Sequence, residues 1–251
     1  MRHRMIGETT MKTIRQAAVA AAAVFLLVSA YVLAQGETAK EEPTAPGSLS
    51  LEQVVVRLQA NYESINTYQA DFEQEIRRLS GAEPITRARG HVLYKKPGKM
   101  VWNYLEPEEH VYINEGNTIW DYSKAEKEAY WLPVKDSIYK SFLLGLGDLE
   151  RDFEISFHAG RKLSHRGEYQ LSLVPRNEEE RQVLGTLTFY VDPESFLVVR
   201  TESVDSLGNR NLITFKNFKL NIELEDSLFK FTPPPGVRVI EADKALREGG
   251  R

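Results

Sequence analysis

Short runs of alternating apolar and polar residues, separated by tight-turn signals, constrain the fold of this chain more than any other feature. In 67–76, Tyr68, Ala70 and Phe72 would face one way and the polar side chains between them the other, which is the period of a half-buried antiparallel strand. Gly, Pro and Asn between successive runs are typical of hairpin turns. Further runs of this kind are 87–96, 99–105, 110–114, 117–123, 128–134, 153–158, 168–175, 185–191, 196–204 and 210–220. A last run, 229–240, carries a Pro triplet, which restricts it to a sheet edge or a strand end.

Two segments change to helical spacing. In 50–65, the apolar residues fall on one side at intervals of three and four, and Ser50 with Gln53 fits a capping box. The segment 135–149 has a similar but weaker pattern, because Gly145 and Gly147 disfavour a helix.

Together these patterns predict a mainly β protein with helices (α+β). Successive short strands joined by tight turns favour a single curved antiparallel sheet of about eleven strands, curled into a barrel or an open half-barrel. The helices should cover the concave face as a lid, because an uncovered apolar face would form a large hydrophobic patch.

The N-terminal part does not belong to this domain. A basic start, an apolar Ala-rich run over 17–29 and small Ala34 before Gln35 predict a signal peptide over 1–34, cleaved near Ala34. The alternative is an anchoring membrane helix, although the run is short for a bilayer span. Translation from Met11 instead of Met1 would give an equally good signal sequence.

The remaining chain divides into a polar linker (35–49), one domain (50–240) and a polar tail (241–251). The net charge of the whole chain is −4, and the predicted signal peptide holds four basic residues and one acid, so the exported protein is more acidic. This charge argues against a nucleic-acid partner. The chain has no cysteine, so neither a disulfide nor a cysteine-linked lipid anchor is available to it.

The sequence contains no recognisable catalytic motif: no Cys nucleophile, no G-x-S-x-G, no H-E-x-x-H and no phosphate loop. We therefore predict that the protein is not an enzyme and uses no metal or cofactor. The histidines lack metal-ligand spacing, and the acidic turn 106–109 and the basic turn around Lys95, Lys96 and Lys99 are more typical of solvated turns.

What remains is an excess of large apolar side chains on the predicted sheet. Two interpretations stay open: a closed hydrophobic core, or a cavity for an apolar ligand beneath a lid formed by 135–149. The residues concerned are Tyr68, Phe72, Tyr94, Met100, Trp102, Tyr104, Tyr112, Trp120 and Trp131.

Three stretches resemble the periplasmic outer-membrane lipoprotein carrier family, LolA. They are 68-YQADFEQ-74, 90-GHVLYKKPGKMVWNYLEPEEHVYINEGNTIWDY-122 and 229-FKFTPPPGV-237. The resemblance covers roughly 50–240, and its most specific parts are the basic-Pro turn before Trp102, the hairpin from Gly116 to Trp120 and the C-terminal stretch.

The resemblance implies an open barrel of antiparallel strands with a helical lid, whose concave face holds the acyl chains of lipoproteins. It implies a monomeric periplasmic carrier that takes cargo from an inner-membrane ABC transporter (LolCDE-like) and passes it to an outer-membrane acceptor (LolB-like). That acceptor shares the fold but is anchored through a cysteine, so the absence of cysteine favours the carrier.

The resemblance also implies which residues line the cavity. Lys96 occupies the position of the family's lid-bonding arginine, and a lysine offers a point charge in place of a planar fork. We expect it to close the lid through a backbone carbonyl. The expected cavity residues are Leu58, Tyr68, Ala70, Phe72, Val92, Tyr94, Met100, Trp102, Tyr104 and Tyr112, with Ile138, Phe142, Leu143 and Leu146 from the lid.

Other functions remain possible on such a fold. One is a LolB-like or other lipid-binding or lipid-sensing envelope protein, which would keep the cavity and change the ligand. Another is a β-domain with a solid core that acts in envelope assembly or regulation.

Overall fold

A computed structural model describes residues 49–79, 85–133, 149–178, 181, 185–205 and 207–242. The predicted signal peptide, most of the linker and most of the tail lie outside these ranges. So does the predicted helix 135–149 apart from its last residue. No helix within the described ranges is long and apolar enough to cross a membrane.

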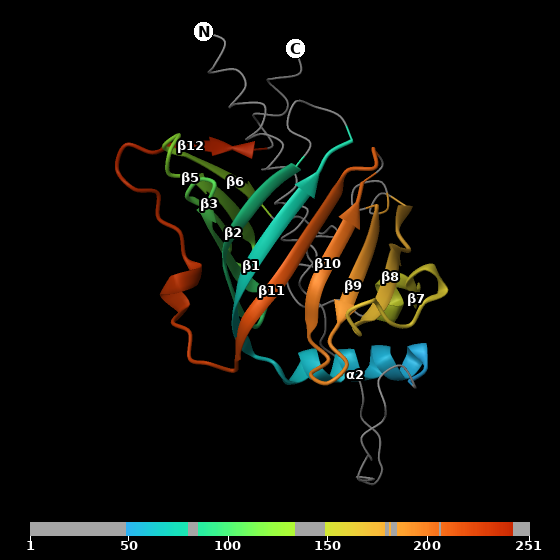
Figure 1. Ribbon diagram of the computed structural model, residues 1–251. Helices are drawn as coiled ribbons and strands as arrows, with labels where there is room; N and C mark the ends of the chain where they lie inside the picture. The colour runs from blue at the N-terminus through green and yellow to red at the C-terminus, as the bar shows by residue number, and fades with distance from the viewer. Residues whose placement is uncertain are drawn as a thin grey trace.

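The described chain forms a single open, curled sheet of twelve strands, accompanied by few helices (Figure 1). The predicted fold class is thereby confirmed. The strands are β1 (Thr67–Arg77), β2 (Ile85–Lys95), β3 (Lys99–Glu106), β4 (His110–Asn114), β5 (Thr118–Ser123), β6 (Glu128–Pro133), β7 (Phe153–Phe157), β8 (Tyr169–Pro175), β9 (Thr186–Val191), β10 (Val198–Val204), β11 (Arg210–Leu220) and β12 (Arg238–Glu241).

The sheet consists of two meanders joined along one seam. Its order is β12-β6-β5-β4-β3-β2-β1-β11-β10-β9-β8-β7, so β1–β6 and β7–β11 each pair in sequence order. The seam is the antiparallel pair of β1 and β11, in which Phe72 lies opposite Phe215. The two chain halves therefore share one continuous concave face.

The C-terminal part departs from the prediction of a purely antiparallel sheet of about eleven strands. β12 is a twelfth strand and pairs in parallel with β6. Before it, the C-terminal segment (221–237) crosses the convex face and contains only a short 3₁₀ turn, η3 (Asp226–Phe229). Because this crossing carries the chain to the β6 edge, β12 can run in the same direction as β6. The proline triplet at 233–235 offers no backbone N–H to a ladder, so β12 begins only at Arg238.

Helix α2 (Leu51–Ser64) begins with the predicted capping box. Ser50 Oγ accepts from the backbone N–H of Gln53, and the Gln53 side chain accepts from the backbone N–H of Ser50. The helix lies across one end of the strands (Figure 1). Asn61 attaches it to the β9–β10 turn, because its amide donates to the carbonyls of Ser195 and Phe196 at 3.0 and 3.2 Å. Two further helical turns are α4 (Leu149–Asp152) and the 3₁₀ turn η2 (His158–Gly160).

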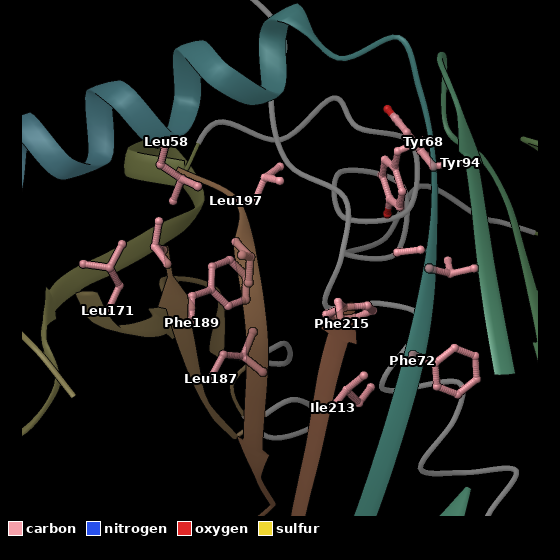
Figure 2. Packing of buried hydrophobic residues seen from close by; sticks show 14 of the residues in the cluster. Leu58, Tyr68, Phe72, Tyr94, Leu171, Leu187, Phe189, Leu197, Ile213 and Phe215 are labelled. Carbon is pink, nitrogen blue, oxygen red and sulfur yellow. The ribbon is translucent and has the colours of Figure 1, made fainter. Parts of the chain in front are cut away.

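Two hydrophobic clusters lie on opposite faces of the sheet. The larger one fills the concave side and includes residues from α2 and from both meanders (Figure 2). The smaller one lies on the convex side, where Leu224 and Phe229 of the C-terminal segment cover Val101 and Ile113. Trp120 belongs to this second cluster, with its ring centroid 5.2 Å from that of Phe231. The C-terminal segment thus covers the outer face of the β2–β5 region.

Candidate functional site

The concave face collects the cavity residues expected from the sequence into one buried cluster. Every one of them that the structure describes belongs to it, and none is more than 5% exposed. Ile138, Phe142, Leu143 and Leu146 lie outside the described residues. The clustered residues are Leu58, Tyr68, Ala70, Phe72, Val92, Tyr94, Met100, Trp102, Tyr104 and Tyr112.

Strand alternation and pairing explain this grouping. Ala70 lies opposite Val92, which lies opposite Trp102, which in turn lies opposite Tyr112. Since residues in register on neighbouring strands share a face, this row crosses four strands on the same side of the sheet.

Aromatic rings dominate the centre of the face. The ring of Phe72 lies 4.9 Å from those of Trp102 and Tyr104, edge to face in both contacts. Trp102 also meets Phe215 across the seam, at 5.9 Å. The indole N–H donates to the sulfur of Met100 at 2.9 Å, so its one polar group is satisfied within the apolar surface. The centre of the face can therefore hold apolar ligand surface without an unpaired indole donor.

Gly90 allows this ring packing. It lies opposite Phe72 on one side and Tyr104 on the other. A Cβ atom there would lie 1.8 Å from the carbonyl oxygen of Asn103 and 2.9 Å from the Phe72 ring. Only glycine permits this approach of β2 and β3.

The second meander contributes half of the face, and sequence reasoning missed it. The signal was present, because 168–175, 185–191 and 210–220 alternate in the same way as the runs in the first half. The patterns predict strands there, but alternation alone does not say which side of each strand faces inward. Figure 2 shows side chains of the second meander together with Leu58, Tyr68 and Phe72. The labelled residues of the second meander are Leu171, Leu187, Phe189, Leu197, Ile213 and Phe215.

Lys96 lies in the turn between β2 and β3 and contacts the C-terminal end of α2. Its ammonium donates to the carbonyl oxygens of Tyr62 and Glu63 at 3.1 and 2.8 Å. Partial burial lowers the pKa of this lysine, and nearby Glu63 acts in the opposite direction. Both carbonyls belong to α2; a bond from Lys96 to the segment 135–149 stays a prediction, because that segment lies outside the described residues apart from Leu149.

A few polar groups also face inward. His110 and Asp121 form an ion-pair contact with side chains 14% and 15% exposed, and the His110 ring lies 4.5 Å from that of Tyr112. Burial, aided by the negative charge of Asp121, raises the pKa of the Tyr104 phenol. Within the described ranges, no three His, Asp or Glu side chains are grouped to hold a metal ion.

The fold and this face define a class: an open, curled sheet with an apolar aromatic concave surface and a helix across one end. The family model described as "Outer membrane lipoprotein carrier protein LolA" matches residues 63–232. The chain belongs to this family.

Individual relatives agree with the family assignment. The outer-membrane lipoprotein carrier protein of Methylococcus capsulatus is 28% identical over 185 residues, covering 74% of this chain and 86% of the relative. The protein of the same name from Chromobacterium violaceum is 25% identical over 225 residues, covering 88% and 98%. Among solved structures, an uncharacterized conserved protein from Thermus thermophilus has a TM-score of 0.50 at 12% identity, covering 76% of this chain and 98% of that one, which is a likeness of fold alone.

Proposed function

We propose that this protein is a periplasmic carrier that binds the acyl chains of lipoproteins on its concave face and shuttles them to the outer membrane. The observation that carries the proposal is the continuous apolar cluster that spans both meanders beneath α2. The names of the relatives support the cargo, and the predicted signal peptide supports the compartment.

The energetics suit such a carrier. Removing acyl CH₂ groups from water contributes about 0.8 kcal/mol each, so one long chain contributes roughly 10 kcal/mol. A shuttle must release this chain again. Broad aromatic surfaces and the flexible Met100 can accept chains of different shape without enclosing them rigidly.

The carrier would act as a monomer between two partners. An inner-membrane ABC transporter of the LolCDE type would load it, and a LolB-like protein, where one exists, would unload it. The protein would need no cofactor, catalytic residue or nucleic acid for this work.

Two tryptophans on opposite faces provide a matched test. Trp102 lies on the concave face and Trp120 on the convex face, beneath Phe231. Purified exported protein would be added to spheroplasts, and released lipoprotein measured by immunoblot. The unaltered protein should release lipoprotein, Trp102→Leu should release several-fold less, and Trp120→Leu should match the unaltered protein.

Thermal unfolding of both variants would show that each remains folded. If the unaltered protein releases no lipoprotein but takes up other acyl lipids, the protein is a lipid carrier of another kind. Equal release by Trp102→Leu and Trp120→Leu would remove the concave face as the binding surface.

A further inference from the structure

The concave face changes character along β1. From the α2 end, its inward residues are Tyr68, Ala70 and Phe72, and the next inward residue is Gln74, which is 3% exposed. Gln74 lies opposite Ile213 of β11, so it belongs to the same face as the apolar cluster. An amide therefore follows the aromatic rings at the end of the face that lies away from α2.

Gln74 is only half satisfied by hydrogen bonds. Its Nε2 donates to Oδ1 of Asn211, itself 8% exposed, at 2.9 Å. Its Oε1 is buried and accepts no hydrogen bond from any described residue. Buried acceptors normally have a donor, and an exception in a native structure calls for an explanation such as a missing ligand.

Arg78 adds a donor at the same end of the face, four residues beyond Gln74. It follows β1 directly and continues the inward positions Gln74 and Ile76. Its Nη1 donates to Oγ1 of Thr86 at 3.2 Å, and Thr86 lies opposite Ile76 on β2. The second guanidinium nitrogen, Nη2, is buried and has no partner among the described residues. An unused donor and an unused acceptor thus occur at the same end of the concave face.

The spacing suits an acyl lipid. Gln74 lies six residues beyond Tyr68, ~20 Å along the strand. One leaflet of a bilayer's hydrocarbon core is ~15 Å deep. A chain whose tip lies near Ala70, ~13 Å from Gln74, would therefore place its linkage to the rest of the molecule at Gln74. The Arg78 guanidinium reaches back to Thr86, which lies opposite Ile76, one inward position beyond Gln74.

We infer that Gln74, Asn211 and Arg78 form a subsite for the linkage groups of the acylated ligand, with Arg78 donating to an ester carbonyl oxygen and Gln74 Oε1 accepting from an amide N–H. This inference rests on the proposed function and adds the orientation of the cargo: acyl tips toward α2, linkage groups toward the opposite strand ends. An ester carbonyl occurs in both lipoproteins and phospholipids. The amide N–H of an N-acylated peptide provides the donor that Gln74 lacks.

Displacement of an apolar fluorescent dye, 1-N-phenylnaphthylamine, tests this orientation. The competing ligands are a synthetic tripalmitoylated lipopeptide, which has ester and amide linkages, and dipalmitoyl phosphatidylcholine, which has esters and no N–H. Arg78→Met should lower the affinity for both lipids about three- to tenfold, which is the effect of one lost hydrogen bond. Gln74→Met should lower the affinity for the lipopeptide by a similar factor and leave the affinity for phosphatidylcholine unchanged.

Matched controls lie on the same strand. Arg77→Met and Gln69→Met change the same residue types at positions of the opposite parity, where Arg77 is exposed, and should leave both affinities unchanged. Direct binding of the dye should be the same in all variants, which shows that the cavity is intact.

The outcomes separate this inference from the proposed function. If the unaltered protein binds the lipopeptide and Arg78→Met and Gln74→Met bind it equally well, the subsite is wrong and the carrier function stands. If the variants lose affinity only for phosphatidylcholine, the subsite recognises phospholipid esters and the lipopeptide assignment is overturned. If the unaltered protein binds the dye but neither lipid, both the inference and the proposed function fail.

Discussion

The ammonium of Lys96 lies 2.8 Å from the carbonyl oxygen of Glu63. With its second bond to Tyr62, one side chain from the β2–β3 turn donates to two carbonyls in the last turn of α2, where a helix has no i+4 N–H groups to offer them. The Tyr62 carbonyl also accepts from the backbone N–H of Ile65 at 3.2 Å. A cation at this end also interacts favourably with the helix dipole. Lys96 therefore holds the end of α2 against the sheet.

Replacing Lys96 should loosen α2. Lys96→Leu is expected to lower the free energy of unfolding by ~1 kcal/mol, a value kept small because the ammonium is partly solvated. It should also raise binding of an apolar dye and slow transfer of cargo. Lys96→Arg keeps the charge and the donors and should retain the stability. Urea denaturation and dye fluorescence measure these effects; identical values for Lys96→Leu and the unaltered protein would make Lys96 a solvated turn residue.

Gly90→Val should be among the most damaging single changes in the domain. The new side chain would overlap the Asn103 carbonyl and the Phe72 ring, and forced overpacking of this kind costs ~3 kcal/mol. Gly116→Ala is the control: its φ of +102° imposes backbone strain, but nothing lies within 4 Å of the added Cβ. In chemical denaturation, Gly90→Val should be much less stable than Gly116→Ala. The reverse order of stability would contradict the close approach of β2 and β3.

A buried ion pair stabilises the second meander. Arg200 donates from Nε and Nη2 to the two carboxylate oxygens of Glu168 at 3.0 and 2.5 Å, with side chains 8% and 12% exposed. Arg200→Met or Glu168→Gln alone should lower the free energy of unfolding by ~3–5 kcal/mol, because each change removes the charged partner of a buried side chain. The double variant should lose less free energy of unfolding than the two single variants lose together. Additive losses in a double-mutant cycle would show that the two side chains are energetically independent.

Asp71 should contribute to the acid sensitivity of the fold. Hydrogen bonds from Asn217 and then from His91, each 2.6 Å long, lower its pKa below 3.8. A carboxyl with a lowered folded-state pKa stabilises the fold above its unfolded pKa, and this stability is lost as the pH falls through the folded pKa. The carboxylate is 39% exposed, so we expect less than ~1 kcal/mol. Between pH 5 and pH 3, Tm should fall less for Asp71→Asn than for the unaltered protein; equal falls would contradict this role.

Most of the fold was predictable from local patterns. The bounds of β1 to β11 agree within about two residues, because period-two alternation and turn residues both mark strand ends. The last run is the exception: the sequence predicts an extended run over 229–240, and β12 spans only Arg238–Glu241. The α2 start was equally clear, since its cap lies within four residues of sequence. The parallel pairing of β12 was not predictable in this way, because it depends on where the C-terminal segment crosses the sheet.

The site was predictable only in part, for a related reason. Trp102 and Trp120 look alike in the sequence, and which face each occupies follows from the whole register and from Phe231 far along the chain. The partner of Gln74, Asn211, lies 137 residues away, so no local pattern connects them. The family resemblance supplied the inward face of β2, which alternation alone leaves ambiguous.

The seam between β1 and β11 has a consequence for how the domain forms. Both meanders contain only pairings between successive strands, whereas the seam joins residues as far apart as Tyr68 and Leu220. Contacts across such long chain separations are slow to form, so the seam should close after both meanders have begun to assemble. Until β11 pairs with β1, the aromatic surface of each half remains in water, and the chain is then most exposed to aggregation.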